Sequence, residues 1–427
     1  MASAENIYDE LDWRGLLFQE SGVNEVRDYL INNKIALYCG FDPTSDSLHI
    51  GNLVPLITLR RFQEFGHRAL PLAGGATGMI GDPSGKSAER NLQTPETIRH
   101  NVECIKGQLA QIIDFKDTDA ELVNNYDWIS KIDIITFLRD IGKYFSVNTM
   151  LQKDSVSSRI SGEGDGISYT EFTYQVLQGY DFLHLNREYG CTMQIGGSDQ
   201  WGNMTAGTDL IRRCTDSKGY VLTVPLITTA DGKKFGKSEK GAIYLDPKKT
   251  CPFDFYQYWI NAQDADVIKL LKFFTFLSKE EIEELEKKTE EEPHLREAQK
   301  RLAQEMTVMI HGQEEFEKAV NATNVLFGRG GDIKAIDAST FASLQEATEG
   351  PTYSSLEDIK GLLQILGDSK LSSSMRDART HVKGNGVSIN NEKITDESYK
   401  ISTSDLLAGH YMLIKRGKKN FTVVKVG

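Results

Sequence analysis

The sequence predicts an α/β protein: a doubly wound parallel sheet of the Rossmann-like type, then an all-α domain, then a small α+β piece. Two features predict the sheet. Short apolar runs at residues 35–39, 68–73 and 191–195 have the length of buried strands, and helical patterns separate them. Each run ends in a glycine-containing loop, and the succession strand, helix, strand, glycine loop is typical of βαβ units. Residues 252–326 are predicted to be wholly helical.

Composition limits the class of protein. The chain has 427 residues, which is too long for one core and indicates two or three domains. No apolar run reaches the length of a membrane span, and the first residues are acidic and polar, unlike a targeting peptide. Five scattered cysteines, without C-x-x-C or zinc spacing, predict reduced thiols. We therefore expect a cytoplasmic protein with no metal site and no membrane association.

The first strand and the loop after it predict a nucleotide site. The strand ends at Gly40, a polar loop with Asp42 and Thr44 follows, and residues 49–52 (HIGN) open a helix. The first N–H groups of a helix lack partners and carry positive potential, so the arrangement favours an anion. Gly51 allows a nucleotide to approach the backbone closely.

The second loop, residues 74–87, is rich in glycine but matches neither common phosphate motif. A Walker loop needs four residues between Gly and Gly-Lys, and this loop has three; its other glycines do not have the spacing of a dinucleotide fingerprint. The interpretation that remains is a loop for close approach that carries Asp82 and Lys86. An ordinary tight turn is the alternative.

A predicted helix at residues 168–185 has one unusual face. Tyr174, Gln178 and Asp181 are spaced i, i+4 and i+7, so they lie along one stripe among apolar neighbours. Three hydrogen-bonding groups in such a row indicate a small polar ligand, because buried polar groups need partners. A solvent-facing stripe, or a network among the three side chains, is the alternative.

Two later segments complete the predicted site. The strand at 191–195 is followed by a polar loop with Asp199, which suits ribose hydroxyls at the carboxyl end of a strand. A strand at 222–228 precedes a loop, residues 231–241, in which Lys233, Lys234 and Lys237 could neutralise polyphosphate charge. A lysine-rich surface turn is the alternative for that loop.

Further elements are predicted between these segments. Helices are expected at residues 11–33, 96–114 and 131–142, with a possible strand at 122–128. Pro55 lies a turn inside the helix that begins near residue 49, where it should remove one backbone hydrogen bond and bend the axis.

The predicted domains are a catalytic domain at residues 1–245, a helical domain at 246–327, a linker at 328–352 and a C-terminal module at 353–427. The linker residues are small and polar with little periodicity. The net charge of the chain is −12, yet the C-terminal module has 12 Lys and Arg against 8 Asp and Glu. A basic module on an acidic body favours a polyanion-binding role, and a solvated basic surface is the alternative.

The motifs resemble those of a known family. Residues 49–52 (HIGN) and 234–238 (KFGKS) are similar to the paired signatures of class I aminoacyl-tRNA synthetases. Four further blocks resemble the bacterial-type tyrosyl-tRNA synthetases, in the family's order and over essentially the whole chain: YCGFDPT, GGATGMIGDPSGKSAER, YTEFTYQVLQGYDF and QIGGSDQWGN. One departure is Asn52, where the family motif usually has a second histidine; Asn can still donate a hydrogen bond to ribose.

The resemblance implies a role for each matching residue. For the amino acid, Tyr38 and Asp181 would hold the phenol hydroxyl, Asp82, Tyr174 and Gln178 the α-amino group, and Gln200 would lie near the carboxylate. The ATP site would be lined by Gly40, Asp42, Gly51, Asn52, Gly197, Asp199 and Lys237. The phosphates would be surrounded by Thr44, His49, Lys86, Arg90, Lys234 and Lys237.

The resemblance also implies the activity and the partners. Such an enzyme activates L-tyrosine with ATP, accompanied by Mg²⁺ and without a tightly bound cofactor, and transfers the tyrosyl group to tRNA(Tyr). It implies a homodimer formed through about residues 125–190. The C-terminal module resembles a small RNA-binding module, with a basic surface supplied by Arg376, Arg379, Lys383, Lys393, Lys415, Lys418 and Lys419. Two alternatives remain: a non-catalytic RNA-binding descendant and a tryptophanyl relative.

Overall fold

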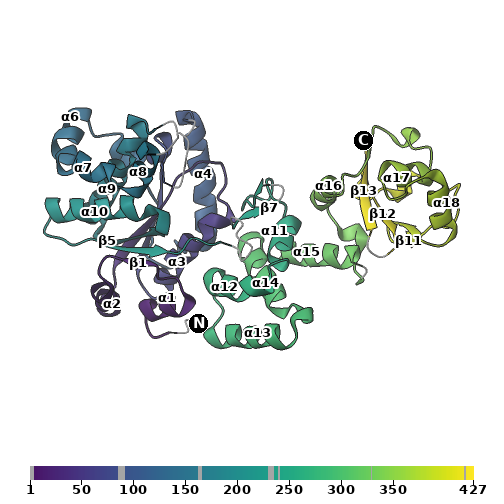
Figure 1. Ribbon diagram of the computed structural model, residues 1–427, viewed down its shortest axis with the longest axis horizontal. Coiled ribbons are helices and arrows are strands. Elements are labelled where there is room, and N and C mark those ends of the chain that lie inside the picture. The colour runs from purple at the N-terminus through teal and green to yellow at the C-terminus, as the bar shows by residue number, and fades with distance from the viewer. Residues whose placement is uncertain are drawn as a thin grey trace. The chain divides into compact units, whose positions relative to one another are not determined.

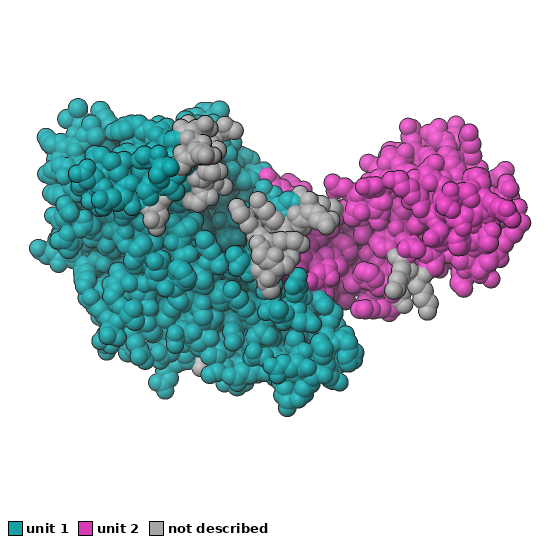
Figure 2. All heavy atoms as spheres, viewed as in Figure 1, with its two compact units in different colours: residues 1–245, 262–302 teal, residues 246–261, 303–427 magenta. Residues whose placement is uncertain are grey.

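A computed structural model describes residues 4–84, 92–161, 166–228, 235–238, 241–327, 329–417 and 420–427. The chain forms two compact units, shown in different colours in Figure 2. Unit 1 comprises residues 1–245 and 262–302, and unit 2 comprises residues 246–261 and 303–427. The helical region predicted as one domain is therefore divided between the two units. None of the described helices is both long and apolar enough to cross a membrane.

Unit 1 is built on a six-stranded sheet with the strand order β1-β6-β5-β2-β3-β4. All neighbouring strands pair in parallel except β1, which runs antiparallel to β6 at the edge. This result confirms the predicted parallel sheet (Figure 1). The strands are β1 (Gln19–Glu20), β2 (Ala36–Phe41), β3 (Arg68–Ala73), β4 (Val123–Asn124), β5 (Cys191–Gly197) and β6 (Tyr220–Val224).

The strand order contains a topological switch point. From β2 the chain proceeds to β3 on one side, and it later returns to β5 and β6 on the other side. The crevice at the carboxyl ends of β2 and β5 is where open α/β sheets bind ligands. Loops with glycine and polar residues follow both strands, as predicted.

Helices α9 (Tyr169–Tyr189) and α10 (Trp201–Cys214) pack against each other beside the sheet (Figure 1). A Cβ on Gly207 of α10 would lie 2.9 Å from the Phe182 side chain, so the glycine allows the two helices to approach closely. Ser168 caps the start of α9, and Gly190 ends it in the left-handed conformation. This packing fixes the orientation of the predicted polar stripe.

The helix predicted to begin near residue 49 begins later than predicted. A short 3-10 turn, η1 (Ile50–Asn52), precedes α3 (Leu53–Glu64). Pro55 therefore lies in the first turn of α3, where backbone N–H groups have no partner within the helix. The expected loss of a hydrogen bond at Pro55 is wrong for this reason.

Three other element predictions need correction. The helix expected at 11–33 is two helices, α1 (Ile7–Arg14) and α2 (Val23–Asn32), because Gly15 ends α1 with φ 74° and strand β1 follows. Only β4 forms within 122–128, and the short helix α5 (Tyr126–Ile129) follows it. Residues 131–142 form the irregular succession α6 (Ile134–Thr136), η3 (Phe137–Ile141) and η4 (Gly142–Tyr144).

The remaining elements of unit 1 include the helix predicted at 96–114 and several short elements that were not predicted. They are η2 (Thr77–Met79), α4 (Pro95–Ile112), α7 (Val147–Leu151), α8 (Asp154–Ser161), η5 (Ser198–Gln200), β7 (Lys237–Ser238), β8 (Gly241–Ala242), α12 (Asp264–Phe274), α13 (Lys279–Glu291) and η6 (Pro293–Leu295). Helices α11 (Pro252–Ile260) and α15 (Gln313–Leu326) belong to unit 2, and α14 (Glu297–His311) spans the division.

Unit 2 contains a five-stranded sheet with the order β11-β10-β12-β13-β9. Two antiparallel hairpins, β10–β11 and β12–β13, lie within this sheet. Its elements after α15 are η7 (Ile333–Ala335), α16 (Ala338–Ala347), β9 (Thr352–Tyr353), η8 (Leu356–Asp358), α17 (Leu362–Asp368), α18 (Met375–Lys383), β10 (Val387–Ile389), β11 (Glu392–Lys393), η9 (Thr403–Asp405), β12 (Tyr411–Arg416) and β13 (Asn420–Val426).

The stretch expected to be an unstructured linker, 328–352, contains a packed helix. Asp337 caps α16, and Phe341 and Leu344 are buried in an apolar cluster that includes residues of β12, β13 and α15. The apolar residues of this stretch are few, but Phe341 and Leu344 are spaced i, i+3 on one helical face. The low average hydrophobicity concealed that face.

Candidate active site

Tyr38 of β2 and Asp181 of α9 form the buried end of the site. Tyr38 is 1% exposed, and its hydroxyl has no hydrogen-bond partner among the described residues. Burial raises the pKa of Tyr38 well above its usual value, and the charge of Asp181 adds to the shift. The Tyr38 hydroxyl is therefore a neutral group that a ligand can satisfy.

Two side chains hold the Asp181 carboxylate in place. Asn125 Nδ2 donates to Oδ2 at 3.0 Å, and Trp128 Nε1 donates to Oδ1 at 2.8 Å. Asp181 is 2% exposed, and burial raises its pKa to about 7, although both hydrogen bonds oppose the shift. A carboxylate in this environment can accept one further hydrogen bond from a ligand hydroxyl.

A chain of hydrogen bonds connects this end to the loop after β2. Asn125 Nδ2 also donates to Thr77 Oγ1 at 2.9 Å, and Thr77 donates to Asp42 Oδ1 at 2.7 Å. The hydroxyl of Tyr174 donates to the other Asp42 oxygen at 2.7 Å. A Cβ on Gly74 would lie 2.0 Å from Asp42 Oδ1, so only glycine leaves room for this network.

Asp82 is the centre of a second polar cluster. Gln200 Nε2 donates to its Oδ2 at 2.7 Å, and Asn203 Nδ2 and the Ser84 amide donate to its Oδ1 at 3.3 and 3.0 Å. The structure thus brings together Asp82 and Gln200, which come from different loops and were assigned to the same ligand.

Two amide oxygens remain available beside these groups. Oε1 of Gln178 on α9 and Oε1 of Gln194 on β5 are buried, and neither has a hydrogen-bond partner within the described part of the chain. Gln194 is in register with Tyr38 on the neighbouring parallel strand, so the two side chains leave the sheet on the same face. Buried acceptors without partners favour a ligand that brings N–H or O–H groups.

The turn at residues 49–52 is a capping box. The Gly51 amide donates to His49 Nδ1 at 3.0 Å, and the His49 amide donates to Asn52 Oδ1 at 3.0 Å. A Cβ on Gly51 would lie 2.8 Å from the His49 ring, which explains the glycine. Asn52 thus shapes the start of α3 through its oxygen, the atom that matters for the cap.

The two signature motifs lie side by side. The Ile50 amide donates to Ile243 O, and the Ile243 amide donates to Gly236 O, both at 3.0 Å. A Cβ on Gly236 would lie 3.3 Å from Ile50 Cγ1 and 3.6 Å from the Gly51 amide nitrogen. Gly236, with φ 85°, therefore brings the backbone of the second motif against the first.

The other predicted nucleotide residues lie around this crevice. Gly40 and Thr44 are exposed after the buried part of β2, and Asp199 is exposed beside Gln200, whose Nε2 lies 3.4 Å from its Oδ2. A Cβ on Gly197 would lie 2.6 Å from Asp199 Oδ1. Lys86, Arg90, Lys234, Lys418 and Lys419 lie outside the described residues, and of Lys237 only the backbone, in β7, is described.

Comparison with known proteins identifies the family. Residues 31–328 match the family model of class I tRNA synthetases (W and Y). Residues 344–424 match the model of the tyrosine–tRNA ligase SYY-like C-terminal domain. The chain belongs to the tyrosyl-tRNA synthetase family. The predicted family is thereby confirmed, and the tryptophanyl alternative is not supported, because the second model is specific to tyrosine–tRNA ligases.

Relatives of this synthetase match over the full length. The chain is 51% identical to a tyrosine–tRNA ligase of Bacillus pumilus over 98% of this chain and 99% of that one. It is 49% identical to tyrosine–tRNA ligase 2 of Bacillus cereus over 99% and 100%. Among solved structures, a C-terminally truncated mitochondrial tyrosyl-tRNA synthetase of Aspergillus nidulans superposes with a TM-score of 0.69 at 29% identity, covering 76% of this chain and 95% of that one.

The basic residues of the synthetase's C-terminal module divide into two groups. Arg376, Arg379 and Lys383 on α18, and Lys393 on β11, are exposed. Lys415 is 8% exposed, and its ammonium donates to the carbonyls of Val325 and Leu326, at the end of α15. Burial lowers the pKa of Lys415. The prediction that Lys415 contributes to an RNA-binding surface is wrong, since it caps a helix within unit 2.

Sequence reasoning missed several residues that shape the site. Asn125 and Trp128 hold Asp181, Thr77 connects Asn125 to Asp42, and Asn203 supports Asp82. One signal was present: Asn125 and Trp128 follow a short strand, at the edge of the sheet where ligands bind.

Proposed function

We propose that this chain is a tyrosine–tRNA ligase. It activates L-tyrosine with ATP, forming tyrosyl adenylate and pyrophosphate, and then transfers the tyrosyl group to the terminal ribose of tRNA(Tyr). The observation that supports this most is the buried pair of Tyr38 and Asp181. Such a pair matches a phenol hydroxyl, whereas phenylalanine would leave the buried Tyr38 hydroxyl without a partner and would offer no further donor to Asp181.

The remaining polar groups suit the other end of tyrosine. Gln178 Oε1 and the Asp82 carboxylate can accept hydrogen bonds from an ammonium group, and Tyr174 lies on the same face of α9 as Gln178. Gln200, fixed by its bond to Asp82, is assigned to the tyrosine carboxylate. Both ends of the substrate are then bound, which positions its carboxylate for reaction.

The proposed chemistry requires no protein nucleophile. A carboxylate oxygen of tyrosine attacks the α-phosphorus of ATP, the bond to the β-phosphate breaks, and pyrophosphate leaves with the electron pair. The protein then has to align the reactants and stabilise charge on the phosphates. We assign the phosphates to Thr44, His49, Lys86, Arg90, Lys234 and Lys237, and the nucleoside to Gly40, Asp42, Gly51, Asn52, Gly197 and Asp199.

We propose that Mg²⁺ enters as part of the nucleotide substrate. Mg²⁺ usually keeps several waters and binds through substrate phosphates. Among the residues the structure describes, no group of three or more His, Cys, Asp or Glu side chains is placed to hold a metal ion. The cation on ATP would neutralise charge on the leaving pyrophosphate.

We propose that the enzyme works as a homodimer in the cytoplasm. Large apolar side chains in and near α6, α7, α8 and the start of α9 are exposed in the single chain, including Ile134 at 65% and Ile135 at 67%. The others are Leu138, Val147, Leu151, Ile160 and Tyr169. Apolar side chains gathered in one segment favour an interface, and a second copy of this chain is the proposed partner.

For the second step we propose that Arg376, Arg379, Lys383 and Lys393 contact tRNA phosphates. Three of them come from one helix, α18, and all four are exposed. Glu397 lies 3.9 Å from Arg379 and 3.5 Å from Lys383, so part of this charge is balanced in the free protein. Phosphates could replace that carboxylate when RNA binds.

Amino-acid-dependent exchange of labelled pyrophosphate into ATP tests the proposal directly. We expect exchange with tyrosine and none above background with tryptophan or phenylalanine. Exchange with tryptophan would keep the chemistry and overturn the substrate. If folded protein that still binds RNA gave no exchange with any of the three, the non-catalytic alternative would be correct.

A further inference from the structure

The second signature motif rests on the end of a helix distant in sequence. The ring of Phe235 stacks on that of Phe274, with centroids 5.3 Å apart and an angle of 22° between the planes. Phe274 is the last residue of α12 and is 0% exposed. Stacked aromatic pairs contribute beyond the apolar area that they bury, so this contact fixes the position of Phe235.

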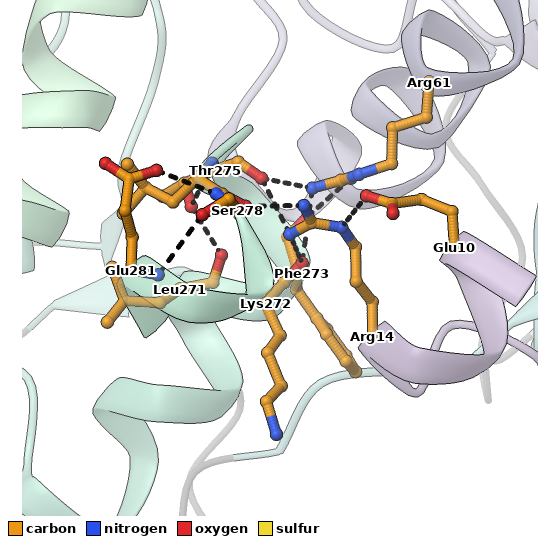
Figure 3. Close-up of polar contacts among 10 residues, drawn as sticks. Glu10, Arg14, Arg61, Leu271, Lys272, Phe273, Thr275, Ser278 and Glu281 are labelled. Atoms are coloured by element: carbon orange, nitrogen blue, oxygen red, sulfur yellow. Dashed lines mark hydrogen bonds and ion pairs between the residues drawn. The ribbon is translucent and has the colours of Figure 1, made fainter. Parts of the chain in front are cut away.

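Two buried arginines donate hydrogen bonds to the end of α12 (Figure 3). Arg61 of α3 donates to the carbonyls of Lys272, Phe273 and Thr275. Arg14 of α1 donates to the carbonyls of Lys272, Thr275 and Leu277. The last carbonyls of a helix lack partners and carry negative potential, so two cations stabilise this end strongly.

The arginine pair is itself supported. Arg14 Nε donates to the Glu10 carboxylate at 2.7 Å, and all three side chains are buried. Figure 3 shows Arg14 and Arg61 reaching the same turn from separate helices. A helix end with this many bonds is a rigid base for the Phe274 ring.

These contacts connect the first signature motif, α3, α12 and the second signature motif. Arg61 lies in the last turn of α3, whereas Ile50 and Gly51 lie in the 3-10 turn at its start. That turn contacts Gly236, the residue after Phe235. Helix α3, which follows the first motif, is therefore hydrogen-bonded through Arg61 to the end of α12. Helix α12 in turn contacts the second motif, because Phe274 stacks on Phe235.

We propose that Phe274 is a positioning residue for adenylate formation. Its ring fixes Phe235 and so holds Gly236 against Ile50 and Gly51. In the sequence, Lys234 and Lys237 flank this Phe-Gly pair, so its position sets where their chain segment meets the ATP phosphates. This inference rests on the proposed function. Phe274 touches neither substrate and acts through Phe235.

Four variants separate positioning from plain core packing. They are Phe274→Leu, Phe235→Leu, the double variant, and Phe273→Leu as a control. Phe273 is the buried neighbour of Phe274 on α12, and its ring is not the one stacked on Phe235. The readouts are the single-turnover rate of tyrosyl-adenylate formation, the tyrosine Kd without ATP, and the melting temperature.

We expect Phe274→Leu and Phe235→Leu each to slow adenylate formation by roughly three- to tenfold, the worth of an aromatic pair. The double variant should be no slower than either single variant, because both remove one contact. Tyrosine Kd should stay within about twofold of wild type, since the tyrosine contacts are distant in the chain and unaltered. Phe273→Leu should lower the melting temperature comparably without slowing the reaction.

Four results would overturn the inference. Phe273→Leu could slow the reaction as much as Phe274→Leu, which would indicate general packing. Phe235→Leu, a change at a half-buried residue, could leave the rate unchanged. If wild-type protein showed no tyrosine-dependent exchange, the proposed function and this inference would both be wrong. If the wild type were active but the rate losses of the two single variants multiplied in the double variant, only this inference would be wrong.

Discussion

The catalytic crevice and the C-terminal sheet use polar side chains in opposite ways. In the crevice, the carboxylates of Asp82 and Asp181 are buried and each is held by specific donors, as Asn125 and Trp128 hold Asp181. On the C-terminal sheet and its helices, cations are exposed at Arg376, Arg379 and elsewhere, while one of the residues with the same charge, Lys415, is buried.

The comparison shows where the type of a residue predicts its environment and where it does not. A polar residue among apolar neighbours at a strand end needs partners, so its burial already points to a site. The charge of a lysine on a hairpin does not show on which face of the sheet its side chain lies. On β12, Lys415 shares a face with Leu413 and Tyr411, which both belong to the apolar cluster against the sheet. The two-residue period, rather than the charge, decides its environment.

The largest effect on activity is expected from a substitution in the crevice. Asp181→Ala should lower kcat/KM for tyrosine in pyrophosphate exchange by roughly 100- to 1000-fold, because the substrate hydroxyl, Asn125 and Trp128 all lose a partner. Asp209→Ala, at an exposed carboxylate that pairs with Arg212 on α10, is the matched control and should be near wild type. Unchanged tyrosine kinetics in Asp181→Ala would remove the basis for the hydroxyl-binding assignment.

The next largest effect should appear only in the second step, the transfer of the tyrosyl group to tRNA. Replacing Arg376, Arg379 and Lys383 together by Ala should weaken tRNA binding by at least tenfold and lower the slope of log K against log salt by about two to three. Pyrophosphate exchange should not change, because the three residues belong to unit 2. Lys370→Ala, at a cation beyond α17 that pairs with Glu349, serves as the control. Equal losses in both variants would contradict a specific RNA-binding face.

A pH profile sharpens the role of burial in the crevice. With a pKa of about 7, Asp181 is mostly protonated at pH 6 and mostly ionised at pH 8. Asn125 and Trp128 already donate to both oxygens, and the ionised form is the stronger acceptor for a further bond from the tyrosine hydroxyl. KM for tyrosine should rise roughly tenfold from pH 8 to pH 6. Asp181→Asn should flatten this profile, and a flat wild-type profile would contradict the assignment.

The smallest effect distinguishes two lysines of the same module. Lys415→Met should destabilise the protein by about 1–3 kcal/mol, because it removes the donor to two carbonyls at the end of α15. Lys393→Met should leave the unfolding free energy unchanged and weaken tRNA binding modestly. Urea denaturation and filter binding measure the two quantities. If Lys393→Met were the less stable variant, the assignment of buried and exposed lysines would be reversed.

Much of the fold could be predicted from the sequence because its strands are short apolar runs with glycine at their ends. The stripe of Tyr174, Gln178 and Asp181 was predictable too, since the spacing within one helix sets which side chains share a face. Boundaries were less accurate where a single residue decides them, as Gly15 ends α1.

The partners of the site residues could not be predicted. Asn125 lies 56 residues from Asp181 and 48 from Thr77, and Trp128 lies 53 from Asp181. Such contacts depend on how the sheet and helices pack, and no local pattern encodes them. The same applies to α12, whose end meets arginines more than 200 residues away.

The capping box at residues 49–52 also determines the tautomer of His49. Because the Gly51 amide donates to Nδ1, a neutral imidazole must carry its proton on Nε2. The ring then presents a donor at the atom away from the backbone without needing a positive charge. The asparagine amide is an uncharged group that also has an acceptor for the backbone N–H and a donor that points outward. Asn is therefore the replacement for His49 that this turn should tolerate best.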